Sequence, residues 1–172
     1  MRFVPVEHAE QAAVCAALAE TIWQEHYTPI IGAAQVAYML RTLQSAEAIG
    51  AQIKEGFRYV LAYEETRPVG YFATVADGDA LKVSKLYLLK AFRGEGRGAK
   101  MLDACEREAR ERGCTRLILS VNRHNPTVGF YEKEGFRKIG TRLQEIGGGF
   151  AMDDYVMARD VDSSRSGCGS PR

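Results

Sequence analysis

The stretch AFRGEGRGAK, residues 91–100, combines glycines and basic residues in a way that suits the binding of a phosphate group. It directly follows a predicted strand and opens a predicted helix, so the unpaired N–H groups of the first helical turn point outward at the positive end of the helix dipole. The glycines leave room for an anion, and the basic residues add local positive charge. These residues are Gly94, Gly96, Gly98, Arg93, Arg97 and Lys100. A diphosphate site explains the stretch better than a flexible turn does.

Two common classes of phosphate-binding loop do not fit this stretch. The loop of a nucleotide triphosphatase ends in Gly-Lys-Ser/Thr, whereas Lys100 follows Ala99 and precedes Met101, which leaves no hydroxyl for magnesium. The dinucleotide fingerprint G-x-G-x-x-G follows the first strand of its fold, whereas these glycines are evenly spaced and follow the fourth predicted strand. The sequence therefore argues against a nucleotide triphosphatase and against a nicotinamide-dependent enzyme.

The segments before the loop determine where it lies. A short strand, RFVPV, precedes a helical pattern that runs from His8 to about Tyr27 and Pro29. A second helix is predicted from about Ala33, and a short third one before Gly56. The segments FRYVLAYEE, PVGYFATVAD and ALKVSKLYLL then predict three consecutive strands joined by tight turns.

The segments after the loop predict a crossover back into the same sheet. Apolar residues at helical spacing end at Gly113, and RLILSVN then predicts a buried strand. A strand, a helix and a strand in this order imply a parallel connection. NPTVGFYEKEGF predicts a short helix that ends at Gly135, and two last strands, near 136–146 and 150–160, flank the turn GGG.

Composition limits the classes of protein that the chain can be. Its 172 residues are enough for one domain with a core, which we place at residues 1–161, and the Gly/Ser-rich end, residues 162–172, is expected to be disordered. A net charge of +1 gives no reason to expect nucleic acid or an anionic membrane as a partner. Four cysteines without metal-like spacing, and a beginning without an apolar run, favour a cytoplasmic protein without a metal.

The pattern R-x-x-G-x-G, formed by Arg93, Gly96 and Gly98, lies between a strand and a helix and is followed by RLILSVN and FYEKEGF. In this order, the three motifs resemble the GNAT superfamily of N-acetyltransferases, and the order of elements matches over about residues 2–160. The resemblance implies an α/β (α+β) fold with a mostly antiparallel, twisted sheet of about seven strands and four or five helices. It also implies that the fourth and fifth strands splay apart.

The resemblance implies acetyl-CoA as co-substrate, with the diphosphate at the loop amides and the pantetheine arm along the fourth strand. A bulge in that strand, and its divergence from the next, would leave unpaired amides that an extended ligand can satisfy. The Leu88 N–H would polarise the thioester carbonyl. The side chains of Asn122 and Asn125 are expected to bind pantetheine amides or to cap the following helix. The expected cofactor-binding residues are Leu86, Tyr87, Leu88, Arg93, Gly94, Glu95, Gly96, Arg97, Gly98, Ala99, Asn122 and Asn125.

Tyr131 occupies the position of the tyrosine that the family uses to protonate the leaving thiolate, which makes it the expected catalytic residue. The alternative is that Tyr131 only packs between Phe130 and Phe136. The base is open, because the strand position that carries a glutamate in some relatives is Ser120 here. A water chain, His26 or a carboxylate of MDDY are the remaining candidates.

In this fold the acceptor slot lies between the first two helices and the last hairpin, which brings WQEHY opposite QEIGGGFAMDDY. Aromatic walls with Glu25, Glu145 and the two aspartates nearby favour a cationic amine. The expected substrate-binding residues are Trp23, His26, Tyr27, Asp153 and Asp154. The alternative is that the acidic residues form a solvated turn. The segments WQEHYTPII and GGGFAMDDYVM also resemble the bacterial polyamine-acetyltransferase-like branch. A protein N-terminus, an amino acid or an aminoglycoside stays open as the acceptor.

The sequence thus predicts an enzyme that moves an acetyl group from acetyl-CoA to a primary amine in a ternary complex. The acceptor is a small molecule or a peptide, with a small cationic amine favoured, and a homodimer is possible. One alternative is a protein of the same fold that does not catalyse a reaction and acts as an acyl-CoA sensor or interaction module. Another is a phosphate-binding regulatory domain unrelated to coenzyme A.

Overall fold

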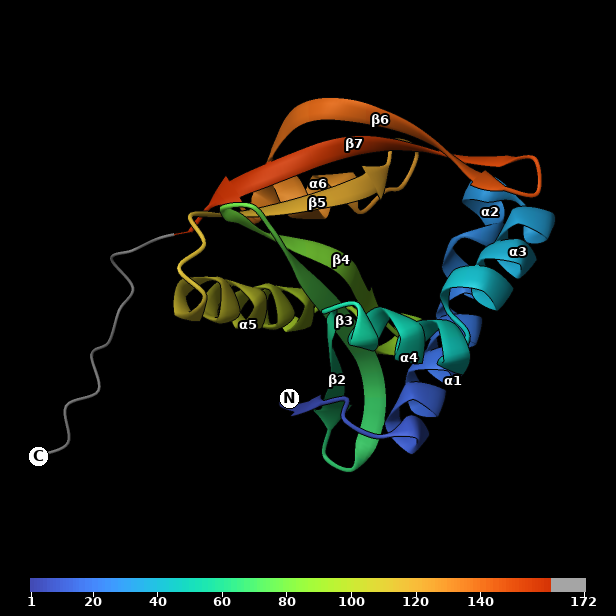
Figure 1. Cartoon of the computed structure of the whole chain (residues 1–172), viewed down its shortest axis with the longest axis horizontal. Coiled ribbons are helices and arrows are strands. Elements are labelled where there is room, and N and C mark those ends of the chain that lie inside the picture. Colours follow the sequence, from blue (N-terminus) through green and yellow to red (C-terminus); the bar gives the residue numbers. More distant parts are fainter. Residues whose placement is uncertain (162–172) are drawn as a thin grey trace, which may run out of the picture.

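The structure is a computed structural model that describes residues 1–161; the predicted tail, 162–172, lies outside the described residues. Figure 1 shows the order of the elements along the chain. The helices are α1 (Ala9–His26), α2 (Thr28–Ile31), α3 (Ala33–Leu43), α4 (Ala46–Lys54), α5 (Arg97–Glu111) and α6 (Val128–Lys133). The strands are β1 (Arg2–Pro5), β2 (Arg58–Glu64), β3 (Arg67–Asp77), β4 (Ala80–Leu88), β5 (Arg116–Asn122), β6 (Arg137–Gly147) and β7 (Phe150–Asp160).

The strands form one seven-stranded sheet in the order β1-β2-β3-β4-β5-β7-β6. All neighbours are antiparallel except β4 and β5, which are parallel because α5 connects them as a crossover. The predicted α/β fold with a mostly antiparallel sheet is confirmed. The short helix α2, which contains Pro29 in its first turn, was not predicted, because four residues are too few to show a helical period.

The sheet is divided at its centre. Strands β4 and β5 pair only through Ala80–Lys82 and Arg116–Ile118, after which β4 continues without a partner on that edge. Over its full length β5 instead pairs with β7. The register of β4 against β3 also shifts, so that Ser84 has no partner and forms a bulge. The predicted splay and the predicted bulge are therefore both present, and together they open the sheet.

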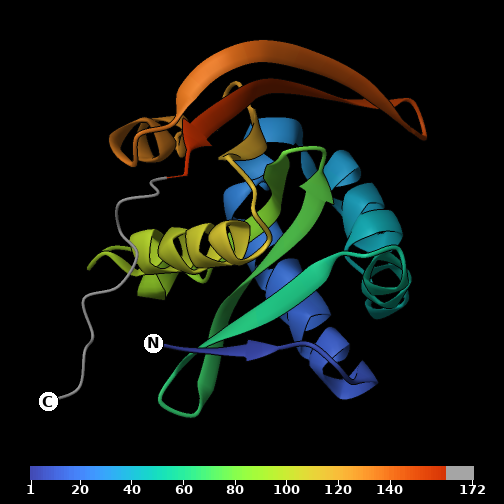
Figure 2. The same cartoon turned by 60° about the vertical axis from the view of Figure 1, so that its left-hand side comes forward.

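Helices cover both faces of the sheet. Helices α1, α3 and α4 pack on one face around Trp23, Ile49 and Tyr71, whereas α5 and α6 pack on the other around Met101 and Tyr131. Figure 1 shows α1, α3 and α4 grouped at the right and α5 at the left, and Figure 2 shows the strongly curved β6–β7 hairpin above them. No helix in the described part of the chain is long and apolar enough to span a membrane.

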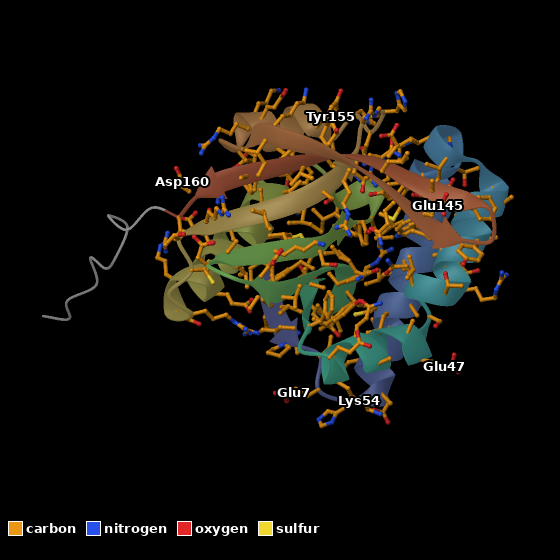
Figure 3. The ribbon with its side chains drawn as sticks, turned by 45° about the horizontal axis from the view of Figure 1, so that its top comes forward. Glu7, Glu47, Lys54, Glu145, Tyr155 and Asp160 are labelled. Atoms are coloured by element: carbon orange, nitrogen blue, oxygen red, sulfur yellow. The ribbon has the colours of Figure 1, made fainter. Side chains whose placement is uncertain are left out.

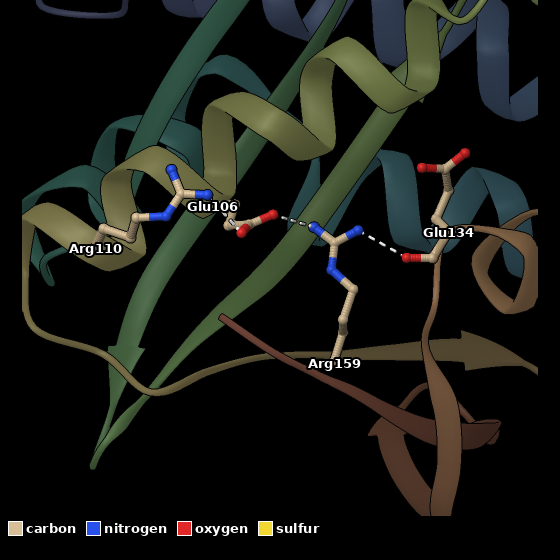
Figure 4. Close-up of polar contacts among 4 residues, drawn as sticks. All are labelled: Glu106, Arg110, Glu134 and Arg159. Carbon is tan, nitrogen blue, oxygen red and sulfur yellow. Dashed lines mark hydrogen bonds and ion pairs between the residues drawn. The ribbon is translucent and has the colours of Figure 1, made fainter. Parts of the chain in front are cut away.

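An ion-pair network fastens the second half of the sheet to α5. Arg159 of β7 donates one hydrogen bond to Glu106 Oε2 at 2.8 Å and another to the Glu134 carbonyl at 2.7 Å (Figure 4). The other oxygen of Glu106 accepts from Arg110 at 2.6 Å. Because both Glu106 and the Arg159 side chain are largely buried, these bonds fix β7 against α5 although β4 and β5 diverge.

The β6–β7 turn is seated on α3. The Tyr38 hydroxyl donates to the Ile146 carbonyl at 2.8 Å, and Gln35 donates to the Ala151 carbonyl at 2.9 Å. Gly147 and Gly148 have φ values of 89° and 60°, and a Cβ on either would come within 2.8 Å of Tyr38. Glycine is therefore required here both for backbone conformation and for close approach. Figure 3 shows Glu145 near this turn and Asp160 at the other end of the hairpin.

Candidate active site

A cavity of about 490 Å³ lies where β4 and β5 diverge. It extends from the glycine loop to α1, α3 and the end of β7, and so joins segments that are far apart in the sequence. The predicted residues that line it are Trp23, His26, Tyr27, Leu86, Tyr87, Leu88, Arg93, Gly94, Gly96, Arg97, Gly98, Ala99, Asn122, Asn125, Tyr131 and Asp154. Two predicted site residues, Glu95 and Asp153, do not line it.

The glycine loop presents unpaired donors to the cavity. Gly94, Glu95 and Gly96 have φ values of 91°, 52° and 71°, which turn the chain sharply into α5. The N–H groups of Gly96, Gly98 and Ala99 have no acceptor among the described residues. Nothing lies within 4 Å of a Cβ built at Gly94 or Gly96, so this side of the loop is open to an anion.

Gly98 has a packing role in addition to the one predicted. A Cβ at this position would lie 2.9 Å from Cζ of Phe130 in α6. Gly98 is therefore needed for the close packing of α5 against α6, because a side chain would displace the ring.

Strand β4 offers its open edge to a ligand. The Leu89 N–H bonds to the Val69 carbonyl at 2.9 Å, and the alternation of an antiparallel ladder then turns the N–H groups of Leu86 and Leu88 away from β3. On that outer side, the Leu88 carbonyl accepts a hydrogen bond from Arg93 Nε at 3.2 Å. An extended chain with amide groups fits beside this edge, in the place that a strand would take.

The loop arginines are engaged within the chain. Arg97 donates to Glu64 at 2.9 Å and to Glu95 at 2.8 Å, and these contacts raise its pKa. The exposed Glu95 carboxylate pairs with Arg97, and Glu95 does not line the cavity. Arg93 points toward His26, as described next. The positive charge expected beside the loop is present, but in part it is already neutralised by carboxylates.

His26, at the end of α1, is held by two residues from other elements. Arg93 donates to its Nδ1 at 3.0 Å, and its Nε2 lies 3.0 Å from Asn125 Oδ1. Because a guanidinium can only donate, Nδ1 must accept and Nε2 must carry the hydrogen that Asn125 receives. Burial lowers the pKa of His26, Asn125 opposes this, and Arg93 lowers it further. With both nitrogens occupied, His26 is poorly suited to the role of base that it was considered for.

Asn125 also caps the segment that leads into α6. Its side-chain oxygen accepts the Thr127 N–H at 3.0 Å. Asn122 behaves similarly, since its oxygen accepts the His124 N–H at 2.9 Å. Both residues line the cavity, but these oxygens accept backbone N–H groups in the turn before α6. Neither caps α6, whose N-cap residue is Thr127 without a side-chain cap bond, and the contact of the two residues with pantetheine stays a prediction.

Tyr131 lies on α6 with its ring between Phe130 and Phe136, at centroid distances of 5.2 and 5.7 Å. Its hydroxyl has no hydrogen-bond partner among the described residues, and the side chain lines the cavity. Burial raises the pKa of Tyr131 well above its usual value, with Tyr27 and Cys105 adding to the shift. The phenol therefore stays protonated and is available as a donor.

The acceptor end of the cavity has an aromatic wall. The Trp23 ring stacks on Tyr27 at 4.3 Å and meets the edge of Tyr87 at 5.8 Å. Burial raises the pKa of Tyr27 to about 12, although the nearby Asn125 and Arg93 lower it. These rings can surround an alkyl chain or an ammonium group.

Only one of the four acidic residues expected near the acceptor lines the cavity. Asp154 is 5% exposed, and its carboxylate makes no hydrogen bond or ion pair with any described residue. Burial raises the pKa of Asp154 to about 6, with Asp153 adding to the effect and Arg142 and Lys82 opposing it. Asp153 instead pairs with Arg123 at 2.7 Å. Glu25 and Glu145 are exposed, so the acidic wall predicted from the sequence is reduced to one carboxylate.

Sequence reasoning missed several lining residues. The most notable is Lys85, a buried lysine on β4; the others include Ser84, Gln35, Met39 and Met152. The segment VSKLYLL alternates as a strand, but a lysine between apolar residues is usually read as solvent-facing. Only the position of α4 and the bulge at Ser84 turn this side chain inward. Ser120 also lines the cavity, and no carboxylate replaces it on β5.

Comparison with known proteins agrees with this geometry. A model of the acetyltransferase (GNAT) domain family matches residues 19–152. An N-acetyltransferase from Mycobacterium tuberculosis is 30% identical over 136 residues, which cover 77% of this chain and 86% of that protein.

Two crystal structures show the same fold at low sequence identity. The PaiA N-acetyltransferase from Thermoplasma acidophilum, in complex with coenzyme A, superposes with a TM-score of 0.72 at 18% identity over 93% of this chain and 99% of its own. A GCN5-related N-acetyltransferase from Rhodopseudomonas palustris superposes with a TM-score of 0.78 at 19% identity, over 92% of this chain and 94% of its own. The family match, the relative and the shared fold lead to one conclusion: the chain belongs to the GNAT superfamily of N-acetyltransferases and is an acyltransferase.

Proposed function

We propose that this enzyme transfers an acetyl group from acetyl-CoA to a primary amine, by direct attack in a ternary complex. The observation that carries the proposal is a single cavity in which unpaired backbone donors, an unpaired phenol and an unpaired carboxylate lie together. The unpaired N–H groups at the start of α5 suit a diphosphate. The open edge of β4 suits the amide-bearing arm of the same molecule.

Acetyl-CoA supplies the activated acetyl group as a thioester. The Leu88 N–H, which faces the open edge, is the donor that we assign to the thioester carbonyl. Tyr131 is assigned to the sulfur, where its hydroxyl donates a proton as the carbon–sulfur bond breaks. The nitrogen of the bound ammonium ion gives up one proton to the base before it attacks, and then forms the new bond to the acetyl carbon as the carbon–sulfur bond breaks. It gives up a second proton, which restores the Tyr131 phenol, and keeps the third as the amide N–H, so the products are an amide and a free thiol.

Asp154 is the group that we assign to receive the proton of the amine. An amine arrives mainly as an ammonium ion at neutral pH, and only its neutral form can attack. A carboxylate with a pKa of about 6 is ionised at neutral pH and is a better proton acceptor than an ordinary aspartate. It also attracts the ammonium ion before the proton leaves, which combines binding and activation in one residue.

The acceptor class expected from the sequence is a small cationic amine of the polyamine type. The unpaired carboxylate of Asp154 and the rings of Trp23 and Tyr27 support the capture of one ammonium group. Polyamines are therefore the natural first test, followed by amino acids, aminoglycosides and peptides with a free N-terminus.

The proposal is tested by measuring thiol release from acetyl-CoA across these amine classes, with mass spectrometry to detect the acetylated amine. We expect release that depends on a primary amine and is not supported by the matching alcohol. Binding of acetyl-CoA without acetylation of any amine in the panel would instead favour a non-catalytic sensor. A loss of signal in Tyr131→Phe, in a protein that still binds acetyl-CoA, would show that the release is catalysed at this site.

A further inference from the structure

Lys85 carries a positive charge that nothing in the described part of the chain balances. The residue is 7% exposed and lines the cavity. Its Nζ donates to Gln52 Oε1 at 2.7 Å and approaches Ser84 Oγ at 3.4 Å, and both of these partners are neutral. No carboxylate of a described residue forms an ion pair with it. An ammonium group has three hydrogens, so one donor is left over.

The surroundings of Lys85 are otherwise apolar and aromatic. Its Nζ lies 5.2 Å from the ring centre of Tyr59 and 5.5 Å from that of Phe57. The Tyr59 hydroxyl donates to the same Gln52 oxygen at 2.7 Å, so this oxygen accepts two hydrogen bonds. Burial lowers the pKa of Lys85 to about 8, and the nearby Lys82 contributes to this. Burying such a charge destabilises the fold unless a counter-charge is supplied, so its presence calls for an external partner.

Lys85 lies on the face of β4 that also carries Tyr87. Lys85 pairs with Ala73 and Tyr87 with Tyr71, with no bulge between the two pairs, so Lys85 and Tyr87 share one face of the strand. Tyr87 in turn contacts Trp23 in the acceptor wall. The indole N–H of Trp23 is also buried without an acceptor among the described residues. The ammonium, which has one hydrogen left to donate, and the unpaired indole N–H therefore belong to the same wall of the cavity.

Asp154 and Lys85 line one cavity but make no contact with each other. A molecule that satisfies both must carry a positive group and a negative group separated by a spacer. We propose that the amine acceptor bears an anionic group, a carboxylate in the simplest case, which binds Lys85 while its amine lies at Asp154. The acceptor class is thus narrowed from cationic amines to amino acids and similar molecules. The proposal rests on the proposed function, because it describes the acceptor of that reaction.

The same charge argues against long polyamines. A second ammonium group that reached Lys85 would meet a like charge in a site of low polarity, which is strongly unfavourable. A carboxylate at that point gains a charge-assisted hydrogen bond and neutralises the buried lysine. Lys85 would then discriminate between acceptors that share an amine and differ only at the far end.

The test compares three acceptors that share a five-carbon chain: 5-aminopentanoate, pentylamine and pentane-1,5-diamine. Homologues with shorter and longer spacers follow. With wild-type enzyme and saturating acetyl-CoA, we expect kcat/KM for the best amino acid to exceed that of the matching alkylamine at least tenfold, with the diamine lowest. An aminoalkylphosphonate of equal length shows whether the anion must be a carboxylate.

The variant Lys85→Met keeps an unbranched side chain that is one atom shorter and removes the charge. Lys90→Met, at an exposed position outside the cavity, is the control. We expect Lys85→Met to abolish the preference for the amino acid, measured as the ratio of its kcat/KM to that of pentylamine, because the anion contact is lost. Lys90→Met should keep the wild-type order. Thermal melting of both variants checks that each is folded.

Three outcomes would overturn the proposal while leaving the proposed function intact. One is equal kcat/KM for pentylamine and every amino acid tested. Another is an equal loss for all acceptors in Lys85→Met, which would make Lys85 part of the general chemistry. The third is wild-type use of succinyl-CoA that Lys85→Met loses, which would place the anion on the acyl donor. Failure to acetylate any amine would instead contradict the proposed function itself.

Discussion

The guanidinium of Arg93 donates a hydrogen bond to Nδ1 of His26 across 3.0 Å, and this contact joins the glycine loop to the end of α1. From His26 the chain of contacts continues to Asn125, which caps the turn before α6 at Thr127. Side chains therefore connect the glycine loop, α1 and the segment that leads to Tyr131. Sequence patterns alone could not show that these side chains contact one another. Movement of any of the three segments would break at least one of these bonds.

We expect the His26 contacts to make stability depend on pH. The folded pKa of His26 is lower than the unfolded value of 6.5, so the unfolded state binds more protons and stability is lost as pH falls below about 6.5. In His26→Gln, an amide replaces the ring and does not titrate. Urea titration measures the free energy of unfolding of both proteins. As the pH falls from 6.5 to 5, wild type should lose stability relative to His26→Gln. The exposed His124→Gln serves as control, and a pH-independent difference for His26→Gln would contradict the expectation.

Gly96→Ala should weaken acetyl-CoA binding at least tenfold, which is about 1.4 kcal/mol. The new methyl group occupies the open side of the loop, and the φ of 71° is strained for alanine. Gly78→Ala is a matched control, because Gly78 has a similar φ of 61° and open surroundings in the turn between β3 and β4. Calorimetry should show weaker binding only for Gly96→Ala. Equal affinity in the two variants would place the diphosphate elsewhere.

Asp154→Asn should lower kcat/KM for the amine by about 10²-fold or more, because the variant cannot accept a proton. In the wild type, the pH profile of kcat/KM should fall below about pH 6 as Asp154 becomes protonated, and the variant should lack this limb. Asp153→Asn is the neighbouring control, since Asp153 pairs with Arg123 outside the cavity. If both variants behave alike, the acidic pair supports the hairpin and does not act on the amine.

Tyr131→Phe should lower kcat by roughly 10²- to 10⁴-fold and spare acetyl-CoA binding, because only the unpaired hydroxyl is removed. The ring contacts with Phe130 and Phe136 remain, so thermal stability should change little. Rates are compared at saturating acetyl-CoA and amine. A wild-type kcat in the folded variant, under conditions where chemistry limits turnover, would leave Tyr131 as a packing residue only.

Lys85→Met should stabilise the protein in the absence of ligand. The folded pKa of Lys85, about 8, is below the unfolded value of 10.5, so stability rises as pH increases from about 8 to 10.5 and the cost of the charge is fully present below pH 8. Removal of the charge should add on the order of 1–3 kcal/mol near pH 7. It should also flatten the pH dependence above pH 8. Chemical unfolding at pH 7 and pH 10 measures both effects, and a less stable variant at pH 7 would contradict them.

The fold was predictable because its signals are local. Periodicity and turn residues indicated most elements in the described part of the chain, and the segment around Arg93, Gly96 and Gly98 indicated the crossover that opens the sheet. The bulge at Ser84 followed from the resemblance to a family and could not be read from its own residues. Patterns of this kind specify which face of an element is buried, and they are short enough to be recognised within one segment.

The side chains of the site were harder to predict because their roles depend on partners from distant segments. Nothing in the sequence distinguishes Asp153, which pairs with Arg123, from Asp154, which lies in the cavity; alternation along β7 separates them only when the sheet order is known. Lys85 gave no signal because its partner Gln52 lies on α4, far away in the sequence, and because the strand is bulged at Ser84. Gly98 has the spacing of a phosphate-loop glycine, yet its close contact is with Phe130.

Trp23 is the single tryptophan of the chain, and it stands in the acceptor wall of the cavity. Its fluorescence is therefore a built-in reporter of that wall, with no contribution from tryptophan elsewhere. The ring is buried against Tyr27, and its N–H has no acceptor among the described residues, so a ligand that approaches it alters both the polarity and the hydrogen bonding that the indole senses. Titration of unlabelled amines can thus be followed by emission alone, before any acetyl donor is added.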